Sequence, residues 1–538
     1  MAERLRRATI LLLAMLGPSP AAAVTVEIYN PVGGVSVKVS LAARLHVQAT
    51  GTNRTVTRED TKITRTKDLI VIHCDPADKE PMDLSVVVPL GFSVDVTTLG
   101  GDIELEGLIR EAWIKTQTGN IRLSVPWDAI RLQLDAERRP KTIELPRSPR
   151  FSSGKLRVSE ERTIWRLRDR LPVRQVTYGR IRVRADRPGR VRLENQPIPA
   201  DSPIKMPWQA PEAVDRILQK SRRPAPAAKS VPGGPAPSVR VPSAGTEISP
   251  REEGATVFRS GVRMVNLLVA VVDAGGPPVT DLSPEDFAIV EDGEPQQVEF
   301  AGSEDLPFNL AILLDLSGST RPDRAAMIAA SKRFVEMAGD QDRVAIYALA
   351  GDLFHVVAPL TSDRASLIAT LSKIPGVSGG SPLYDAIALA YAEELHDREG
   401  ERNALVIISD GIDNRLSGQA DAPSRLKFRR LLKAAGQMNA LLYPVFLLSG
   451  ERFGRGWSKK ARERMQQLAG ASHGRVFEAS SIQDLEPVYP LLASELRAIY
   501  SVAYYPSNQD FRGRWRKVQV KVRRPGATPR TRKGYFAR

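Results

Sequence analysis

The chain has 538 residues, too many for one hydrophobic core, and 42% of them are hydrophobic. Its 40 prolines and 39 glycines indicate globular domains joined by linkers and exclude a chain that is disordered throughout. The formal net charge of +15 comes with no zinc-finger spacing and no aromatic ribonucleoprotein motif, which argues against a nucleic-acid partner.

Residues 1–23 have the three parts of a secretory signal peptide. Arginines at positions 4, 6 and 7 precede an apolar run over 8–16, and Ala21-x-Ala23 provides a small-residue cleavage site. The run is shorter than the ~20 residues of a membrane span, which favours cleavage before Val24 over an uncleaved anchor. We therefore expect an exported protein, periplasmic, on the cell surface or secreted, with no transmembrane span after cleavage.

The single cysteine, Cys74, excludes an internal disulfide and is expected to be a buried structural thiol. An exported chain of this size without disulfides is typical of a bacterial envelope.

Residues 24–195 alternate apolar and polar side chains, which predicts an all-β domain. Two stretches are alike, "VDVTTLGGDIELEG" from Val94 and "AWIKTQTGNIRLSV" from Ala112, and "VTYGRIRVRA" from Val176 is a candidate third copy. Each is a strand, a glycine-centred turn and a strand, as in a short solenoid; a β-sandwich with similar hairpins is the alternative. The "GxI" turns resemble those of a bacterial adhesin-like β family.

Residues 196–256 are rich in Pro, Ala and Gly and predict an extended linker, with "APEAVDRILQKS" as a candidate for one or two helical turns within it. Residues 257–306 predict β-strands joined by turns at "DAGGPP" and "EDGE". Residues 500–538 predict further strands and a basic tail. From residue 511 onwards there are eleven Lys or Arg and no Asp or Glu. That composition suits a solvated strand face or, as the alternative, a patch for an anionic envelope polymer or lipid.

Residues 307–499 alternate apolar strands with helices. The strands include "NLAILLD", "NALVIISDG" and "LLYPVFLLS", and the helices include "DRAAMIAASKRFVEMAG" and "SPLYDAIALAYAEELHD". Strands this apolar, separated by helices of this length, predict a mainly parallel, doubly wound α/β (Rossmann-like) sheet covered on both faces.

Three loops at the carboxyl edge of this predicted sheet carry oxygen-bearing side chains. In "AILLDLSGSTR", Asp315 ends a strand, and Ser317 and Ser319 follow at alternate positions. Ser381 follows a Gly-Gly turn before a helix, and Asp410 ends another buried strand. Because ligands of open α/β sheets bind beyond the carboxyl ends of the strands, we expect these five residues to converge.

Two carboxylates and three hydroxyls make a hard donor set composed of oxygen alone. Zinc and copper fit it poorly because it contains no His or Cys, so the expected cofactor is Mg²⁺ or Mn²⁺. Neutral hydroxyls leave much of the charge of such an ion unneutralised, so the ion would attract a carboxylate from a partner. A site of this kind binds, and it needs no nucleophile.

The same motifs resemble the von Willebrand factor type A domain. "DLSGS" matches the Asp-x-Ser-x-Ser element of that family, "GGSPLYDA" the loop that normally carries a threonine, and "ISDGID" the loop with the second aspartate. The resemblance implies a metal-ion-dependent adhesion site in which Ser317, Ser319 and Ser381 ligate directly, while Asp315 and Asp410 act largely through water. Serine at position 381 lacks the methyl group that stiffens threonine, which predicts a weaker site that still coordinates.

Segments 257–306 and 498–538 resemble the surroundings of type A domains in exported proteins of soil bacteria, Acidobacteria in particular. The resemblance implies an α/β domain inserted between β-sandwich segments. We therefore predict an exported, non-enzymatic binding or adhesion protein that engages, through Mg²⁺, an acidic group on a protein or matrix partner. The alternative is a metal-independent envelope scaffold whose β and basic surfaces organise cell-surface polymer. An enzyme ranks third, because no general base stands out beside the site.

Overall fold

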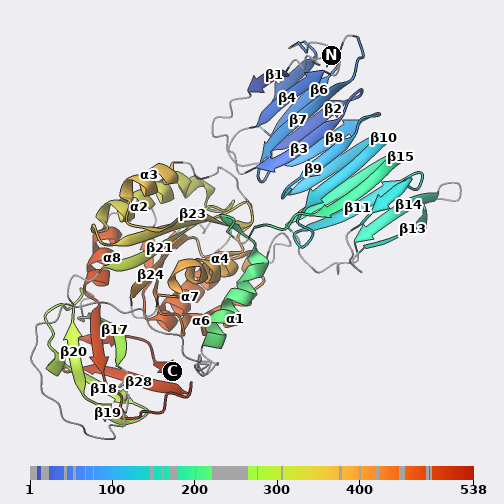
Figure 1. The fold of residues 1–538 in the computed structure, drawn as a ribbon. Coiled ribbons are helices and arrows are strands. Elements are labelled where there is room, and N and C mark those ends of the chain that lie inside the picture. Colours follow the sequence, from blue (N-terminus) through green and yellow to red (C-terminus); the bar gives the residue numbers. More distant parts are fainter. Residues whose placement is uncertain are drawn as a thin grey trace, which may run out of the picture.

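The computed structural model describes most of the chain, in segments separated by gaps. The described residues are 9–13, 24–40, 45–51, 56–57, 59–66, 68–76, 78–145, 151–158, 163–169, 178–199, 201–220, 264–274, 277–303, 307–372, 374, 379–398, 401–417, 423–447, 455–479, 484 and 487–537. They form three bodies that follow one another along the molecule, with the α/β body in the middle (Figure 1).

The N-terminal β domain contains one sheet of fifteen strands in its described residues. Its central strands form two rows of parallel strands. The long strands β10 (Glu111–Val125) and β15 (Gly179–Asn195) belong to both rows and so connect them. The first row also contains β2 (Thr25–Asn30), β6 (Leu69–Cys74), β8 (Ser93–Thr98) and β11 (Ile130–Ala136). The second row also contains β3 (Val35–Ser40), β7 (Met82–Pro89), β9 (Ile103–Glu106) and β12 (Thr142–Glu144).

Antiparallel strands close both ends of the rows. They are β1 (Thr9–Leu13), β4 (His46–Gly51), β5 (Thr61–Arg65), β13 (Phe151–Arg157) and β14 (Thr163–Asp169). The backbone of β1 lies within the predicted signal peptide, and the rest of residues 1–23 lies outside the described residues.

A glycine corner joins the two rows and produces the sequence repeat. In β10 the buried residues change from even to odd numbers, with Ala112 and Ile114 before the corner and Ile121 and Leu123 after it. Gly119, at the corner, has a φ of +116°, and a Cβ added to it would lie 2.4 Å from the carbonyl oxygen of Gly101. Parallel pairing of successive turns favours the stacked arrangement over hairpins, because the strands of a hairpin pair antiparallel.

The α/β domain has a sheet of seven strands in the described residues, in the order β16-β23-β22-β21-β24-β25-β26. The central strand β21 (Phe308–Asp315) is parallel to β22 (Arg343–Ala350) and to β24 (Arg402–Ser409). The outer strands are β16 (Ile204–Lys205), β23 (Leu353–Thr361), β25 (Leu441–Leu447) and β26 (Phe477–Ala479). β23 is antiparallel to β22, and β25 and β26 continue the parallel side.

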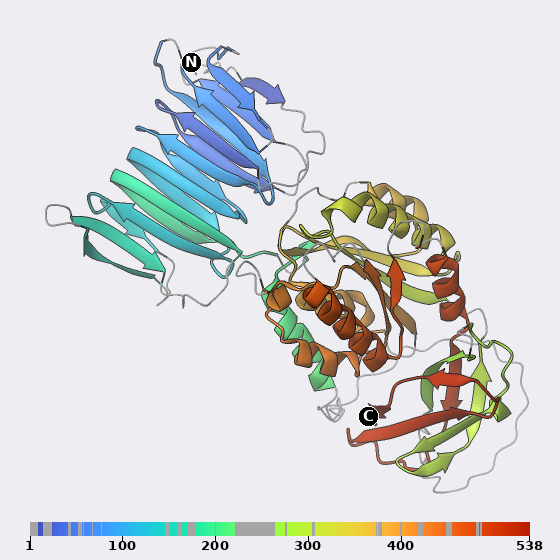
Figure 2. The same cartoon turned by 180° about the vertical axis from the view of Figure 1, so that it is seen from behind.

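Helices cover both faces of this sheet (Figures 1 and 2). One face packs against α2 (Arg324–Met337), α3 (Arg364–Leu371) and α8 (Val488–Arg497). The other packs against α1 (Ala210–Lys220), α4 (Leu383–Ala390), α6 (Phe428–Ala435) and α7 (Arg455–Ser472). Each strand must therefore be apolar on both sides, which confirms the predicted doubly covered, mainly parallel sheet. Within the described residues, no helix combines the length and the apolarity that crossing a membrane requires.

The predicted linker over residues 196–256 is corrected at its N-terminal end. Strand β16 pairs with the edge strand β23, and α1 buries Ala213, Val214 and Ile217 in the core of the α/β domain. The stretch "APEAVDRILQKS" predicts one or two helical turns within the linker, whereas the structure has an 11-residue helix there that packs on the sheet. Residues 221–256 lie outside the described residues.

The third body is a β-sandwich built from both flanks of the α/β domain. One sheet contains β17 (Val265–Val272), β20 (Val298–Gly302), β27 (Tyr500–Tyr504) and β29 (Thr528–Arg530). The other contains β18 (Phe287–Glu291), β19 (Glu294–Gln296), β28 (Trp515–Val522) and β30 (Gly534–Phe536). The predicted basic tail is corrected too, because it supplies β29 and β30. The expectation of a solvated basic strand face is also corrected for Arg516 of β28, which is only 2% exposed.

Candidate metal centre

The first loop of the candidate site begins where β21 ends. Asp315 is the last residue of β21 and is fully buried, and the neighbouring parallel strand β24 ends at Ser409, just before Asp410. Leu314 of β21 is aligned with Ile408 of β24, so both strands reach the same edge of the sheet. The two aspartates therefore lie side by side because their strands are parallel and in register.

Hydrogen bonds inside the first loop orient its serines. The backbone amide of Ser317 donates to Oδ1 of Asp315 over 3.2 Å. The hydroxyl of Thr320 donates to the carbonyl oxygens of Asp315 and Ser317, and this closes the turn. The hydroxyls of Ser317 and Ser319 are 3.1 Å apart, as the alternate spacing of the motif predicts.

The second loop meets the first through both backbone and side chain. The amide of Gly318 donates to the carbonyl oxygen of Gly379 over 2.9 Å. The hydroxyl of Ser381 donates to Oδ2 of Asp315 over 3.2 Å, and Ser381 is only 3% exposed. Residues 66 positions apart in the sequence are thus brought into contact at this edge.

Two side chains of the third loop were missed by the sequence analysis. The hydroxyl of Ser409 donates to Oδ2 of Asp315 over 2.6 Å, and Oδ1 of Asn414 accepts from the amide of Ser381 over 3.0 Å. Both belong to the stretch "SDGIDN" around Asp410, so the signal was present in the motif. Their partners could not be assigned without the pairing of β21 with β24.

Asp410 carries an oxygen atom without a hydrogen bond. Its Oδ1 accepts from the amide of Ile412 over 3.0 Å, whereas its Oδ2 is buried and has no partner among the described residues. Burial, and next the charge of Asp315, raise the pKa of Asp410 to about 7, while the amide of Ile412 and, to a lesser extent, the side chain of Ser319 oppose the shift. Burial also raises the pKa of Asp315. Two adjacent buried carboxyl groups of this kind are stable when ionised only if a positive charge compensates them.

The donor set fits a hard divalent cation. It consists of the two carboxyl groups and the hydroxyls of Ser317, Ser319 and Ser381, all of them oxygen ligands. Among the described residues, no group of three or more His, Cys, Asp or Glu side chains gathers anywhere, so hydroxyls would have to supply part of the coordination here. The lone Oδ2 of Asp410 is an acceptor that a cation or its water would satisfy.

Two further buried aspartates anchor the loops. Asp385 of α4 accepts from the amides of Arg425 and Leu426 over 2.6 and 2.8 Å, and burial raises its pKa to about 8. Asp413 accepts from the amide of Tyr384 over 3.1 Å and from the hydroxyl of Ser424, and burial raises its pKa to about 6. They accept hydrogen bonds from backbone amides around the second and third loops.

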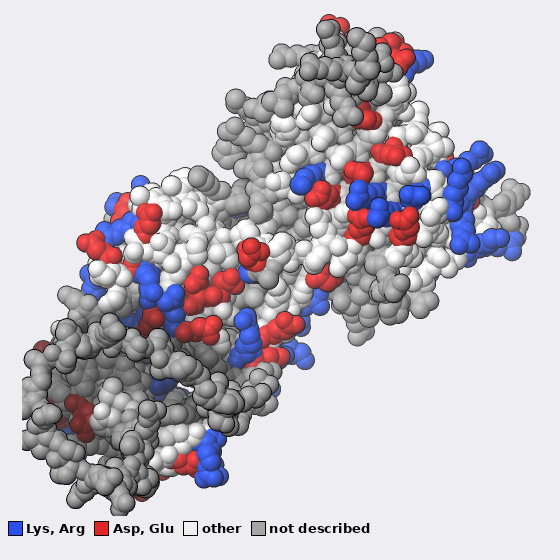
Figure 3. All heavy atoms as spheres, in the orientation of Figure 1, with Lys and Arg blue, Asp and Glu red and all other residues white. Residues whose placement is uncertain are grey.

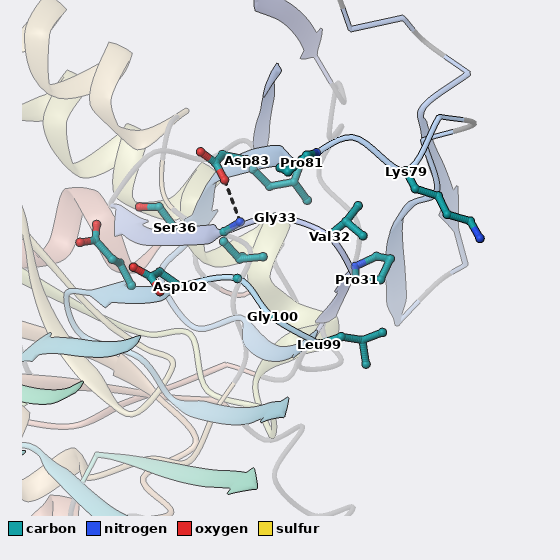
Figure 4. A pocket seen from close by; sticks show the side chains of 15 residues that line it. Pro31, Val32, Gly33, Ser36, Lys79, Pro81, Asp83, Leu99, Gly100 and Asp102 are labelled. Atoms are coloured by element: carbon teal, nitrogen blue, oxygen red, sulfur yellow. Dashed lines mark hydrogen bonds between the residues drawn. The ribbon is translucent and has the colours of Figure 1, made fainter. Parts of the chain in front are cut away.

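The described surface also has a groove on the β domain (Figure 4). It has a volume of about 850 Å³ and lies beside the glycine corner, where Asp83 accepts from the amide of Gly34 over 2.8 Å. None of the five candidate ligands lines it. It therefore plays no part in the candidate metal centre.

Comparison with known proteins identifies the domain that holds these loops. The family model described as von Willebrand factor type A domain matches residues 310–412, so the chain contains such a domain within a larger multidomain protein. The match covers Asp315, Ser317, Ser319, Ser381 and Asp410. No curated protein matches the chain.

Solved structures resemble parts of the chain at low identity. They include the conserved hypothetical protein BatB from Bacteroides thetaiotaomicron, with 18% identity over 35% of this chain and 98% of that one, at a TM-score of 0.27. Proximal thread matrix protein 1 from the mussel byssus, "with zinc occupied MIDAS motif", has 15% identity over 38% of this chain and 50% of its own, at 0.29. The pilus adhesin SpaC from Lactobacillus rhamnosus GG has 10% identity over 50% of this chain and 47% of its own, at a TM-score of 0.30. At these scores the likeness carries no argument about what this chain binds.

Proposed function

We propose that this chain is an exported, non-enzymatic binding protein that engages an acidic group of a protein or matrix partner through a divalent cation. The cation would be Mg²⁺ or Mn²⁺, held by Ser317, Ser319 and Ser381 directly and by Asp315 and Asp410 largely through water. The supporting observation is the convergence of three loops on two buried carboxyl groups, one of which has an oxygen atom without a hydrogen bond.

Each side chain has a part in this proposal. Asp315 holds the loops together by accepting from Ser381 and Ser409, and it keeps the Ser381 hydroxyl at the site. Asp410 contributes the free acceptor, and Ser317 and Ser319 add adjacent hydroxyl oxygens. A bound cation would supply positive charge with an open position for a carboxylate of the partner. Ser319 is the most exposed of the five candidate ligands, whereas the other four are buried.

Calorimetric titration of Mg²⁺ and Mn²⁺ into the full chain tests the proposal. We expect Asp410→Asn to weaken binding about tenfold or more, because it removes a charge from the donor set and turns the free acceptor into an amide. Asp340→Asn is the matched control, since Asp340 is exposed and pairs with Arg364 over 2.9 Å, away from the site. Equal binding by wild type and Asp410→Asn, or no binding by wild type, rejects the proposal.

Capture of partners with and without EDTA separates this function from the scaffold alternative. Binding that survives chelation but is lost when the basic residues of segment 511–538 are neutralised would favour an anionic envelope polymer. The structure offers limited support for that alternative. Arg512, Arg516 and Arg524 already pair with Asp510, Glu291 and Asp281.

Charges on the β domain are similarly mixed (Figure 3). Lys38 pairs with Glu106 over 3.1 Å, and Arg122 pairs with Glu194 over 3.0 Å. In the face shown, blue and red side chains lie next to one another across the middle of this domain, and a group of mostly blue side chains lies at its right-hand edge. Basic side chains that already pair with acidic ones in the same domain leave less free positive charge for an anionic polymer.

A further inference from the structure

The β domain contacts the α/β domain beside the candidate metal centre. The contact is made on the two-residue turn between β22 and β23, Gly351 and Asp352. Leu353, directly after this turn, is 1% exposed and packs within the hydrophobic core of the β domain. Strand β16, which follows the β domain in the chain, pairs with β23 at the same end. The turn is therefore enclosed by a neighbouring domain.

One ion pair crosses this contact. Nη2 of Arg110, between β9 and β10 of the β domain, lies 3.1 Å from Oδ2 of Asp352. The side chain of Asp352 is only 8% exposed, so water screens this pair less than it screens the surface pairs of the same domain. The hydroxyl of Tyr178 is buried without a partner among the described residues, and burial raises its pKa, while the charge of Arg110 lowers it and that of Asp352 raises it.

Asp352 also binds the second loop of the candidate metal centre. Its Oδ1 accepts a hydrogen bond from the amide of Gly380, the residue before Ser381. A Cβ added to Gly379 would lie 2.7 Å from the amide nitrogen of Asp352, so the second loop and the turn are in close backbone contact. Asp352 has a φ of +67°, a left-handed conformation that, apart from glycine, Asp and Asn adopt most readily.

A continuous chain of contacts thus leads from the β domain to the candidate ligands. Arg110 binds Asp352, Asp352 holds Gly380, and Ser381 donates to Asp315. A second branch runs from Gly379 to Gly318 in the first loop. Each link is a direct contact between named atoms. Both branches run through the second loop, which supplies one of the proposed hydroxyl ligands.

We propose that Arg110 is a positioning residue for the candidate metal centre, and that docking of the β domain through Asp352 sets the cation affinity of the site. The inference rests on the function proposed above. A type A domain released from its β domain would keep all five candidate ligands, but the loop that carries Ser381 would lose its fixed position. Coupling of this kind is reciprocal, so a bound cation would also strengthen the contact between the two domains.

The test compares four variants of the full chain: Arg110→Ala, Arg110→Lys, Asp352→Asn and the double variant Arg110→Ala/Asp352→Asn. We expect Arg110→Ala and Asp352→Asn each to weaken Mg²⁺ binding in calorimetry by about 2- to 10-fold. The double variant should bind Mg²⁺ with the same affinity as whichever single variant binds it less tightly, because both changes break the same contact. Arg110→Lys keeps the charge and should retain part of the affinity. Asn at position 352 tolerates the left-handed backbone, so this variant is expected to fold.

The matched control is Arg122→Ala, which removes another paired arginine of the β domain, one that pairs with Glu104 and Glu194 and not with Asp352. It should leave Mg²⁺ affinity unchanged. Additive losses in the double variant, or an Arg110→Ala affinity equal to that of Arg122→Ala, would overturn the inference.

Hydrogen exchange with EDTA present gives a second measurement that needs no cation. We expect the amides of residues 379–381 to exchange faster in Arg110→Ala than in wild type, and at the wild-type rate in Arg122→Ala. If wild type binds no cation, the proposed function fails while the exchange result still decides the coupling. If wild type binds Mg²⁺ and Arg110→Ala changes neither affinity nor exchange, the inference fails alone.

Discussion

Asp410 links the proposed cation to the pH dependence of the fold. Its pKa is raised to about 7, chiefly by burial, above the value of about 4 that an aspartate has in an unfolded chain. Between these two values the folded chain holds a proton that the unfolded chain has lost. The contribution of this group to stability is therefore largest below about pH 4 and falls as the pH rises towards 7.

We predict that in EDTA the chain loses thermal stability between about pH 5 and about pH 7.5, and that Mg²⁺ restores it at the higher pH, because a cation replaces the lost proton. Scanning calorimetry at both pH values, with and without Mg²⁺, measures this. In Asp410→Asn the loss of thermal stability between these pH values should be smaller, and Mg²⁺ should restore little stability. Part of the decrease should remain, since burial also raises the pKa values of Asp385 and Asp413, while the buried His355 and His473, whose pKa values are lowered by burial, act in the opposite direction below about pH 6.5. Wild-type stability that rises with pH in EDTA would contradict the prediction.

At the same scale, the sequence identified the five candidate ligands but not the residues that hold them. The spacing Asp-x-Ser-x-Ser is local, so Asp315, Ser317 and Ser319 could be recognised directly. Ser409 and Asn414 form hydrogen bonds with Asp315 and Ser381, which lie 94 and 33 residues away in the sequence. No local pattern encodes such contacts, which appear only when β24 is placed beside β21.

At the scale of elements, the glycine corners explain why the β domain repeats. A Cβ at Gly101 would lie 1.7 Å from the carbonyl oxygen of Gly33, one turn away, so the stacked turns leave no room for a side chain. The sequence showed the glycines and the similar strands, but it left solenoid and sandwich open. Whether successive turns pair in parallel depends on strands distant in sequence, such as β2 with β6.

We predict that Gly101→Ala destabilises the β domain by at least about 2 kcal/mol, because the added methyl group must displace the backbone of the next turn. Urea unfolding followed by circular dichroism measures the free energy. Gly154→Ala is the matched control: no atom lies within 4 Å of a Cβ built there, so it should change stability by less than about 0.5 kcal/mol. Equal effects of the two substitutions would show that the corner has room to adapt.

At the scale of the whole molecule, the sandwich depends on contacts across the inserted α/β domain. Glu291 of β18 and Arg516 of β28 form a fully buried ion pair at 2.8 Å, although 225 residues separate them. The hydroxyls of Tyr504 and Tyr535 also donate to Glu291, over 2.5 and 2.8 Å. The sequence placed Arg516 in a basic segment and assigned it to solvent or to an anionic polymer.

We predict that Glu291→Gln destabilises the chain by about 3–5 kcal/mol, since it leaves the buried charge of Arg516 without its partner. Arg524→Ala, which removes an exposed pair with Asp281, serves as the control and should have little effect. Thermal unfolding of both variants checks this. If the two variants have the same unfolding midpoint, the buried ion pair contributes no more to stability than the surface pair.

The sequence by itself determined the local features of this protein: the apolar strands, the helical spacings, the glycine turns and the oxygen-rich ends of three loops. These follow from periodicity and side-chain chemistry, which act over a few residues. Only the tertiary structure decided that α1 packs on the α/β domain, that Arg516 is buried, and that Arg110 reaches Asp352 beside the candidate site. Those contacts join residues more than a hundred positions apart, and they form only when the chain closes its sheets and excludes water between them.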